Sequence, residues 1–135
     1  MKKLLLLLLT LFLLMHTLCA CANDEQRLKA HIDSLLEDQS YYFWALEDRL
    51  SLCREDLAEC GFVLTEDIPD MPMYRAGRQG YECWIFLCAS VADAKAVMAV
   101  AEAVDGSAYA HYSCLRKGTV VFAGERSAVA NFSDY

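Results

Sequence analysis

From Asp24 to Cys60 the chain contains neither glycine nor proline, so no residue there forces the backbone to turn. Apolar or aromatic residues recur in this stretch in steps of three and four, the period of one helix face: Leu28, Ile32, Leu35, Leu36, Tyr42, Phe43, Leu46, Leu50, Cys53, Leu57 and Cys60. We therefore expect helix over 24–60, either bent or broken near residues 37–40. Residues 21–40 would form a helical riser or linker, and Tyr42 to Cys60 would pack on the domain.

The remainder of the chain alternates between strand patterns and breakers. Residues 61–67 predict a strand from their branched and aromatic content. Residues 68–80 predict a loop, because two prolines and two glycines punctuate them. Residues 81–89 are apolar on nearly every position, which is typical of a central strand covered on both faces.

The C-terminal part predicts a helix, a hairpin and a last short helix. Ser90 can cap a helix that begins at Val91 and ends at Gly106. Residues 107–115 and 119–124 predict two strands joined by a turn that ends at Gly118. Residues 125–132 add a short helix.

The element order α-β-β-α-β-β indicates an α+β fold. About four antiparallel strands covered by two main helices would make a two-layer sandwich. The order equals that of a ferredoxin-like β-α-β-β-α-β fold with its first strand moved to the end. We expect one small domain over 41–135, preceded by an N-terminal signal helix.

The first 21 residues carry a leader. Lys2 and Lys3 precede a leucine-rich run, and the run exits through Leu18-Cys19-Ala20-Cys21. This ending resembles the lipobox of bacterial lipoproteins, with a small residue, Ala20, before the cut and a thiol after it. The resemblance implies a signal peptide over 1–20 and a lipid on Cys21, while Cys19 leaves with the leader.

The resemblance also implies a place for the protein. Lipoproteins of this kind receive a diacylglycerol, and two acyl chains give stable attachment where one gives only marginal binding. The protein would then sit on the cell membrane, facing outside the cytoplasm. Two other interpretations stay open, namely an ordinary secretory cut before Asn23 and an uncleaved signal anchor.

The formal charge limits the partners. Removing Lys2 and Lys3 with the leader takes the net charge from −7 to −9. Such an acidic surface argues against nucleic acid, whose binding depends on phosphate contacts from Lys and Arg. It also argues against electrostatic adhesion to anionic lipid, so the lipid on Cys21 would do the anchoring.

Five cysteines follow Cys21, and none are spaced as CxxC: Cys53, Cys60, Cys83, Cys88 and Cys114. Cys53 and Cys60 are two helical turns apart, about 10 Å, which exceeds the reach of a disulfide. Cys83 and Cys88 would point to opposite faces of one strand. The pattern favours cysteines used as small buried hydrophobes, although their redox state stays open.

The chain has no recognisable catalytic motif. It lacks a Gly-rich phosphate loop, a GxSxG and an HExxH. His111 and Cys114 are three apart and would point to opposite faces of a strand, so they do not predict a metal site. We expect no catalytic residues, no metal and no cofactor.

The segment 68–80 is the candidate contact region. Tyr74 offers apolar contact, and Arg75 and Arg78 offer forked donors for carboxylate or phosphate. The aromatic run from Tyr41 to Trp44 is the next candidate. We therefore expect a non-catalytic binding or regulatory module that contacts an envelope protein or wall polymer. The alternative is a thiol-based or metal-handling envelope protein that uses Cys83, Cys88 and Cys114.

Overall fold

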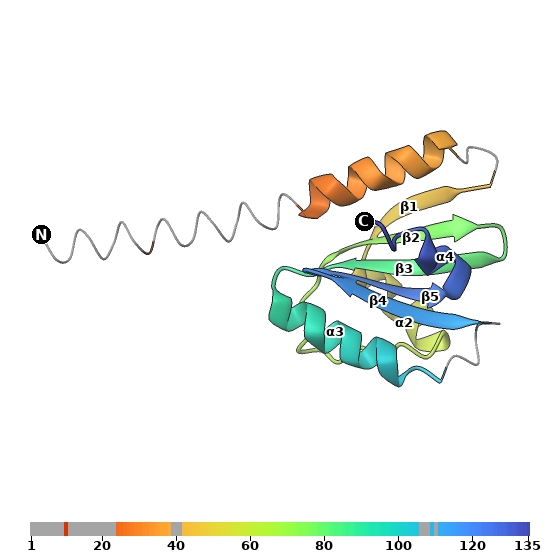
Figure 1. Cartoon of the computed structure of the whole chain (residues 1–135). Helices are drawn as coiled ribbons and strands as arrows, with labels where there is room; N and C mark the ends of the chain where they lie inside the picture. Colours follow the sequence, from red (N-terminus) through yellow and green to blue (C-terminus); the bar gives the residue numbers. More distant parts are fainter. Residues whose placement is uncertain (1–9, 11–23, 39–41, 106–108, 110) are drawn as a thin grey trace, which may run out of the picture.

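Five antiparallel strands form one sheet, in the order β1-β2-β3-β5-β4 (Figure 1). The strands are β1 (Trp44–Arg49), β2 (Pro72–Arg78), β3 (Tyr81–Leu87), β4 (Tyr112–Lys117) and β5 (Val120–Glu125). Four helices occur among the described residues: one over residues 24–38, α2 (Leu50–Glu59), α3 (Val91–Ala103) and α4 (Arg126–Ala130). The expected α+β class is confirmed.

This computed structural model describes residues 10, 24–38, 42–105, 109 and 111–135. The expected signal helix and the expected lipobox Leu18-Cys19-Ala20-Cys21 lie outside the described residues, apart from Thr10. No helix in the described part of the chain is both long and apolar enough to cross a membrane.

Helices cover both faces of the sheet, so the expected two-layer sandwich is wrong. Trp84 and Phe86 of β3 pack in a core with α2 and α3, on one face. Their neighbours Cys83 and Ile85 pack in a second core with α4 and the helix over 24–38, on the other face. Because successive residues of a strand point to opposite faces, a strand that is apolar throughout needs a cover on each side.

The helix over 24–38 packs on the sheet, and in that respect it differs from the riser expected for residues 21–40. Leu28 is fully buried and Ile32 is 5% exposed, both within the second core. Asp24, at its start, accepts a hydrogen bond from the Thr119 hydroxyl (2.6 Å) through its carboxylate and one from the Tyr135 hydroxyl (2.9 Å) through its carbonyl. This first described turn is therefore fixed to both the β4–β5 turn and the end of the chain.

The helix expected over Tyr42–Cys60 is wrong in its first part, which forms the edge strand β1. Phe43 and Ala45 face the second core, while Leu46 faces the opposite side. A continuous apolar run satisfies the strand period as well as the helix period. Pairing with β2 decides between them, since it gives the backbone of β1 a hydrogen-bonded neighbour. Helix resumes at Leu50 as α2.

The strand expected at 61–67 is wrong, and the loop expected at 68–80 is wrong over residues 72–78, which form β2. Residues 61–67 form turns and irregular structure, and Phe62 there is nevertheless buried. The strand β2 begins at Pro72, and proline is tolerated at the first residue of a strand. The position of Gly77 within β2 requires a glycine, because an added Cβ would collide with the Tyr81 carbonyl oxygen. The breakers thus mark a strand start and a close approach between strands.

The elements from β3 onward agree more closely with those expected from the sequence. β3 is the expected central strand, and α3 begins at Val91 with the Ser90 hydroxyl accepting from the Asp93 amide at 3.1 Å. The β4–β5 hairpin turns at Gly118, whose φ of +59° is the left-handed conformation that glycine adopts without penalty. The short C-terminal helix is α4, and Gly106, the expected end of α3, lies outside the described residues.

Candidate functional site

Arg75 lies at the centre of a polar and aromatic cluster on the sheet face that carries α2. Its Nε donates to Glu82 Oε2 at 2.9 Å and its Nη2 donates to Glu82 Oε1 at 2.8 Å. The guanidinium carbon lies 5.2 Å from the Trp84 ring centroid and 5.9 Å from the Trp44 ring centroid. A forked donor paired with a carboxylate and stacked on aromatic rings has a fixed orientation.

The register of the sheet explains why these side chains meet. Arg75 pairs with Leu46 on one side and Trp84 on the other, so all three share a face. Glu82 pairs with Gly77, which has no side chain. Arg75 and Glu82 are therefore diagonal neighbours on adjacent strands, a separation that a long side chain spans.

We call Trp44, Leu46, Arg75 and Glu82 the Arg75 patch. Leu46 is 61% exposed, and the Arg75 and Glu82 side chains are 40% and 31% exposed. The patch borders β1, an edge strand of the sheet. It therefore combines an exposed aliphatic group, an aromatic ring and an oriented charge pair beside a strand edge, which is a composition suited to protein recognition.

Electrostatics favour the charged form of Arg75. The hydrogen bonds to Glu82 raise the pKa of Arg75 above its ordinary value, with burial opposing the effect. Because Glu82 already occupies two donors of Arg75, a partner would meet an ion pair rather than a lone cation. The patch is thus suited to mixed apolar and polar contact.

The structure separates the three side chains expected to act together. Tyr74 is buried on the opposite face of β2, where it packs in the second core. Arg75 is half-buried in the patch, and Arg78 is exposed at the end of β2. Cys21 lies outside the described residues.

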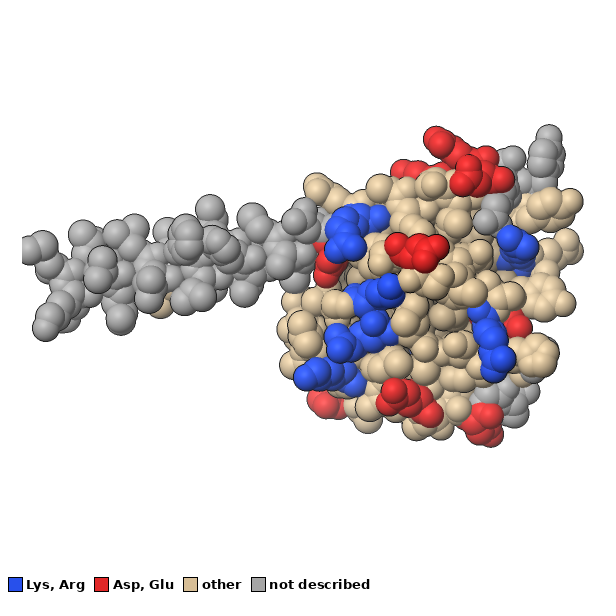
Figure 2. Space-filling view, viewed as in Figure 1, with Lys and Arg blue, Asp and Glu red and all other residues tan. Residues whose placement is uncertain are grey.

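Charge is unevenly distributed over the surface. Figure 2 shows Lys and Arg side chains gathered beside the point where the described chain begins, on one face of the molecule. Arg27 lies 3.8 Å from Asp24 and is stacked at 5.1 Å on the Tyr135 ring, and Lys117 donates to the Ser133 carbonyl at 2.6 Å. A domain with a net negative charge therefore has a basic region at one end.

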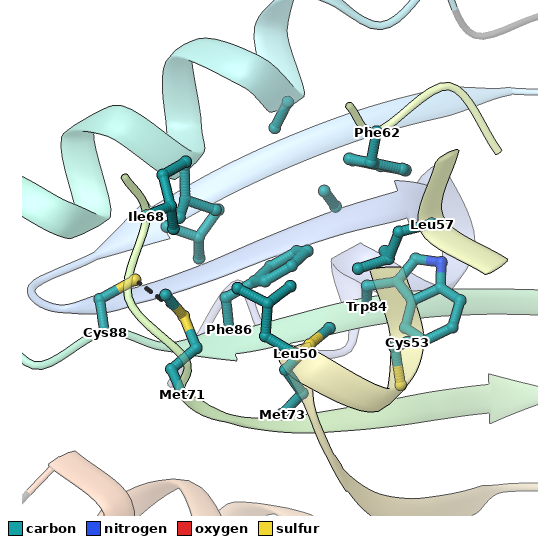
Figure 3. Packing of buried hydrophobic residues seen from close by; sticks show 14 of the residues in the cluster. Leu50, Cys53, Leu57, Phe62, Ile68, Met71, Met73, Trp84, Phe86 and Cys88 are labelled. Atoms are coloured by element: carbon teal, nitrogen blue, oxygen red, sulfur yellow. Dashed lines mark hydrogen bonds between the residues drawn. The ribbon is translucent and has the colours of Figure 1, made fainter. Parts of the chain in front are cut away.

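The five described thiols are free, and they serve mainly as packing groups. Cys53, Cys83 and Cys88 are buried, and the Cys88 thiol lies 3.7 Å from the Met71 sulfur (Figure 3). Burial raises the pKa of Cys53 and of Cys88 to about 12, and it raises the pKa of Cys83 further. Since the thiolate is the reactive form, these thiols lack the usual activation.

A metal centre has little support among the residues that the structure describes. No group of three or more His, Cys, Asp or Glu side chains there is arranged to hold a metal ion. The His31 Nε2 lies 2.7 Å from the Asn131 carbonyl, so it ties the first helix to the end of α4.

Sequence reasoning missed Glu82, Trp84 and Leu46 as members of the site. Glu82 was the single acid in an otherwise apolar strand, and a charge in such a place calls for a partner. Trp44 belonged to the aromatic run that was the second candidate. The pairing of β1 with β2 brings it to Arg75, and that pairing depends on recognising both strands.

Comparisons with known proteins give no information about the site. No family model, curated protein or solved structure matches this chain.

Proposed function

We propose that this protein is a lipid-anchored extracytoplasmic lipoprotein whose domain binds a partner protein at the cell envelope, without catalysis of its own. The observation that carries the anchoring is the sequence Leu18-Cys19-Ala20-Cys21, which ends three residues before Asp24, where the helix over 24–38 begins as described. Two acyl chains on Cys21 would hold the domain at the membrane surface.

The binding role is supported by the Arg75 patch. Leu46 is a large aliphatic side chain left 61% exposed on an edge strand, beside a tryptophan and an oriented arginine. Tyr, Trp and Arg are the residues that most often dominate binding energy at interfaces. The raised pKa values of Cys53 and Cys88 favour binding over a thiol-based function.

We also propose that α2-β2-β3-α3-β4-β5 is a permuted ferredoxin-like unit to which β1, α4 and the helix over 24–38 are added. The strand order β2-β3-β5-β4 supports this, because it is the order expected when the first strand of that fold moves to the end. The packing of α2 and α3 in one core supports it too.

Anchoring is tested by fractionating cells that express the native chain, Cys21→Ala and the matched control Cys19→Ala. We expect native protein and Cys19→Ala in the membrane fraction, since Cys19 would leave with the leader. Cys21→Ala should be unprocessed or lack lipid. Equal membrane retention with identical processing in all three would contradict the proposal.

Binding is tested by photo-crosslinking on intact cells, with a photoreactive residue placed at Leu46 and, as a control, at Val63. Val63 is 69% exposed and lies outside the patch. We expect a discrete protein adduct from position 46 that Arg75→Ala weakens and position 63 does not give. The same adducts from both positions, or a wall-polymer adduct alone, would contradict a protein partner at the patch.

A further inference from the structure

The start of the first helix, the β4–β5 turn and three cations lie together at one end of the domain. We call this the tether end: Asp24, Arg27, Arg116, Lys117, Gly118 and Thr119. Thr119 bonds the Asp24 carboxylate at 2.6 Å, and Arg116 Nη1 donates to the Gly118 carbonyl at 2.8 Å. The Arg27 side chain is 62% exposed.

We propose that the tether end is a second membrane contact, at which Arg27, Arg116 and Lys117 bind anionic phospholipid headgroups. This inference rests on the proposed lipid at Cys21. It gives the domain a fixed orientation on the bilayer, with the β4–β5 turn against the headgroups.

The link between Cys21 and Asp24 is short, so a lipid on Cys21 would bring the tether end into contact with the bilayer. Only Ala22 and Asn23 separate Cys21 from Asp24, and the three Cα–Cα steps span about 10 Å even when fully extended. A headgroup layer is roughly 5–8 Å thick on each side of the hydrocarbon core. Asp24 and its neighbours therefore lie within about one Debye length, roughly 8 Å, of the lipid phosphates.

On the β4–β5 side of the helix start, the acidic residue Asp24 is partly neutralised. On the β1 side, several acidic residues lie close together. Asp24 is engaged by Thr119 and lies 3.8 Å from Arg27. Across the helix start, a hollow of about 460 Å³ is lined by Glu25, Glu47, Asp48 and Arg49 among others.

This uneven distribution of charge sets the direction in which the domain tilts on the bilayer. Anionic headgroups attract the side with Arg27, Arg116 and Lys117 and repel the side with Glu47 and Asp48. Figure 2 shows the grouped cations next to the start of the described chain. Asp134, which follows the Ser133 that Lys117 bonds, offsets part of the positive charge.

The test uses the full lipid-bearing chain in two kinds of vesicle, phosphatidylcholine alone and phosphatidylcholine with phosphatidylglycerol, with amide hydrogen exchange as the readout. We expect slower exchange at residues 115–120 on the anionic vesicles only, while residues 47–49 stay unchanged. Arg116→Gln with Lys117→Gln should reduce this protection, by on the order of fivefold for each charge.

Two single variants act as directional controls. Arg78→Gln removes a cation at the last residue of β2, at the end of that strand away from the tether end (Figure 1). It should leave the protection of residues 115–120 unchanged. Asp134→Asn should increase it. Bilayer-bound protein whose residues 115–120 exchange equally on both vesicles would overturn the inference while leaving the anchor intact. Protein whose intact mass carries no lipid would overturn the proposed function, and the inference with it.

Discussion

Arg75 donates two parallel hydrogen bonds of 2.9 and 2.8 Å to the carboxylate of Glu82, its diagonal neighbour on β3. The pair is part-exposed, so its net contribution is that of a good surface ion pair with added stacking on two tryptophans. Exposed pairs contribute up to about 1 kcal/mol, and a cation over an exposed ring contributes about 0.5–1 kcal/mol more.

Arg75→Ala should therefore lower the free energy of unfolding by about 1–2 kcal/mol, because it removes both the pair and the stack. Glu82→Gln should cost less, since the stack remains. A double-mutant cycle by urea denaturation measures the coupling between them, and we expect roughly 0.5–1 kcal/mol. Additive effects of the two changes would show that the bidentate pair contributes nothing.

The close approach of β5 to β3 should make Gly124 intolerant of any side chain. A Cβ there would lie 2.6 Å from the Glu82 carbonyl oxygen and 2.7 Å from Cys83 Cα, at a φ of +151°. Gly124→Ala should cost about 3 kcal/mol or more, from backbone strain and overpacking together.

Gly80→Ala is the matched control, because Gly80 has a φ of +78° and nothing within 4 Å of its added Cβ. It should cost only the conformational penalty, about 1–2 kcal/mol. Thermal or chemical denaturation compares the two. Equal losses would mean that the β3–β5 contact at Gly124 is not as close as described.

The helix over 24–38 should stabilise the whole domain. Leu28→Ala removes a fully buried side chain from the second core, so we expect a loss of about 2–4 kcal/mol in unfolding free energy. Glu37→Ala changes an exposed position of the same helix and should cost less than about 0.5 kcal/mol. A free-standing riser would instead tolerate both changes equally.

The sequence predicted the fold correctly where a segment fitted only one kind of secondary structure, and it failed where a segment fitted both helix and strand. The strand over 81–87 and the capped helix after Ser90 have one dominant pattern each, and both were found. The run from Tyr42 to Leu46 fits helix and strand alike, and only its pairing with β2 makes it a strand. Pro72 and Gly77 read locally as loop signals, whereas their roles depend on the neighbouring strand.

The candidate site was predictable only in part. Arg75 was singled out, but its partners Glu82, Trp84 and Leu46 come from two other strands and depend on register. Tyr74 and Arg75 were grouped as neighbours in a loop, and a strand sends such neighbours to opposite faces.

The buried thiols should make stability fall at alkaline pH. The pKa of Cys53 and of Cys88 is raised to about 12 from an ordinary value of 9.0, because burial disfavours the thiolate. Above pH 9 the unfolded chain loses these protons while the folded protein keeps them. Their stabilising contribution is thus complete below pH 9 and declines toward pH 12, by up to about 1.4 kcal/mol per pH unit for each thiol.

Urea denaturation at pH 8, 9 and 10 under reducing conditions measures this slope. Cys53→Ala with Cys88→Ala should make it shallower, although the double change also costs stability at pH 8. In the native protein both thiols should react with a thiol reagent only on unfolding. Immediate modification of Cys53 or Cys88 in the folded protein would contradict their assignment as packing groups.

Intact-mass analysis of the mature protein purified from membranes decides whether Cys21 carries a lipid. We expect a chain that begins at Cys21 and carries the added mass of a diacylglyceryl group on that residue, with Cys19 absent. A mature chain that begins at Asn23 without lipid, or one that retains Met1 to Ala20, would contradict it.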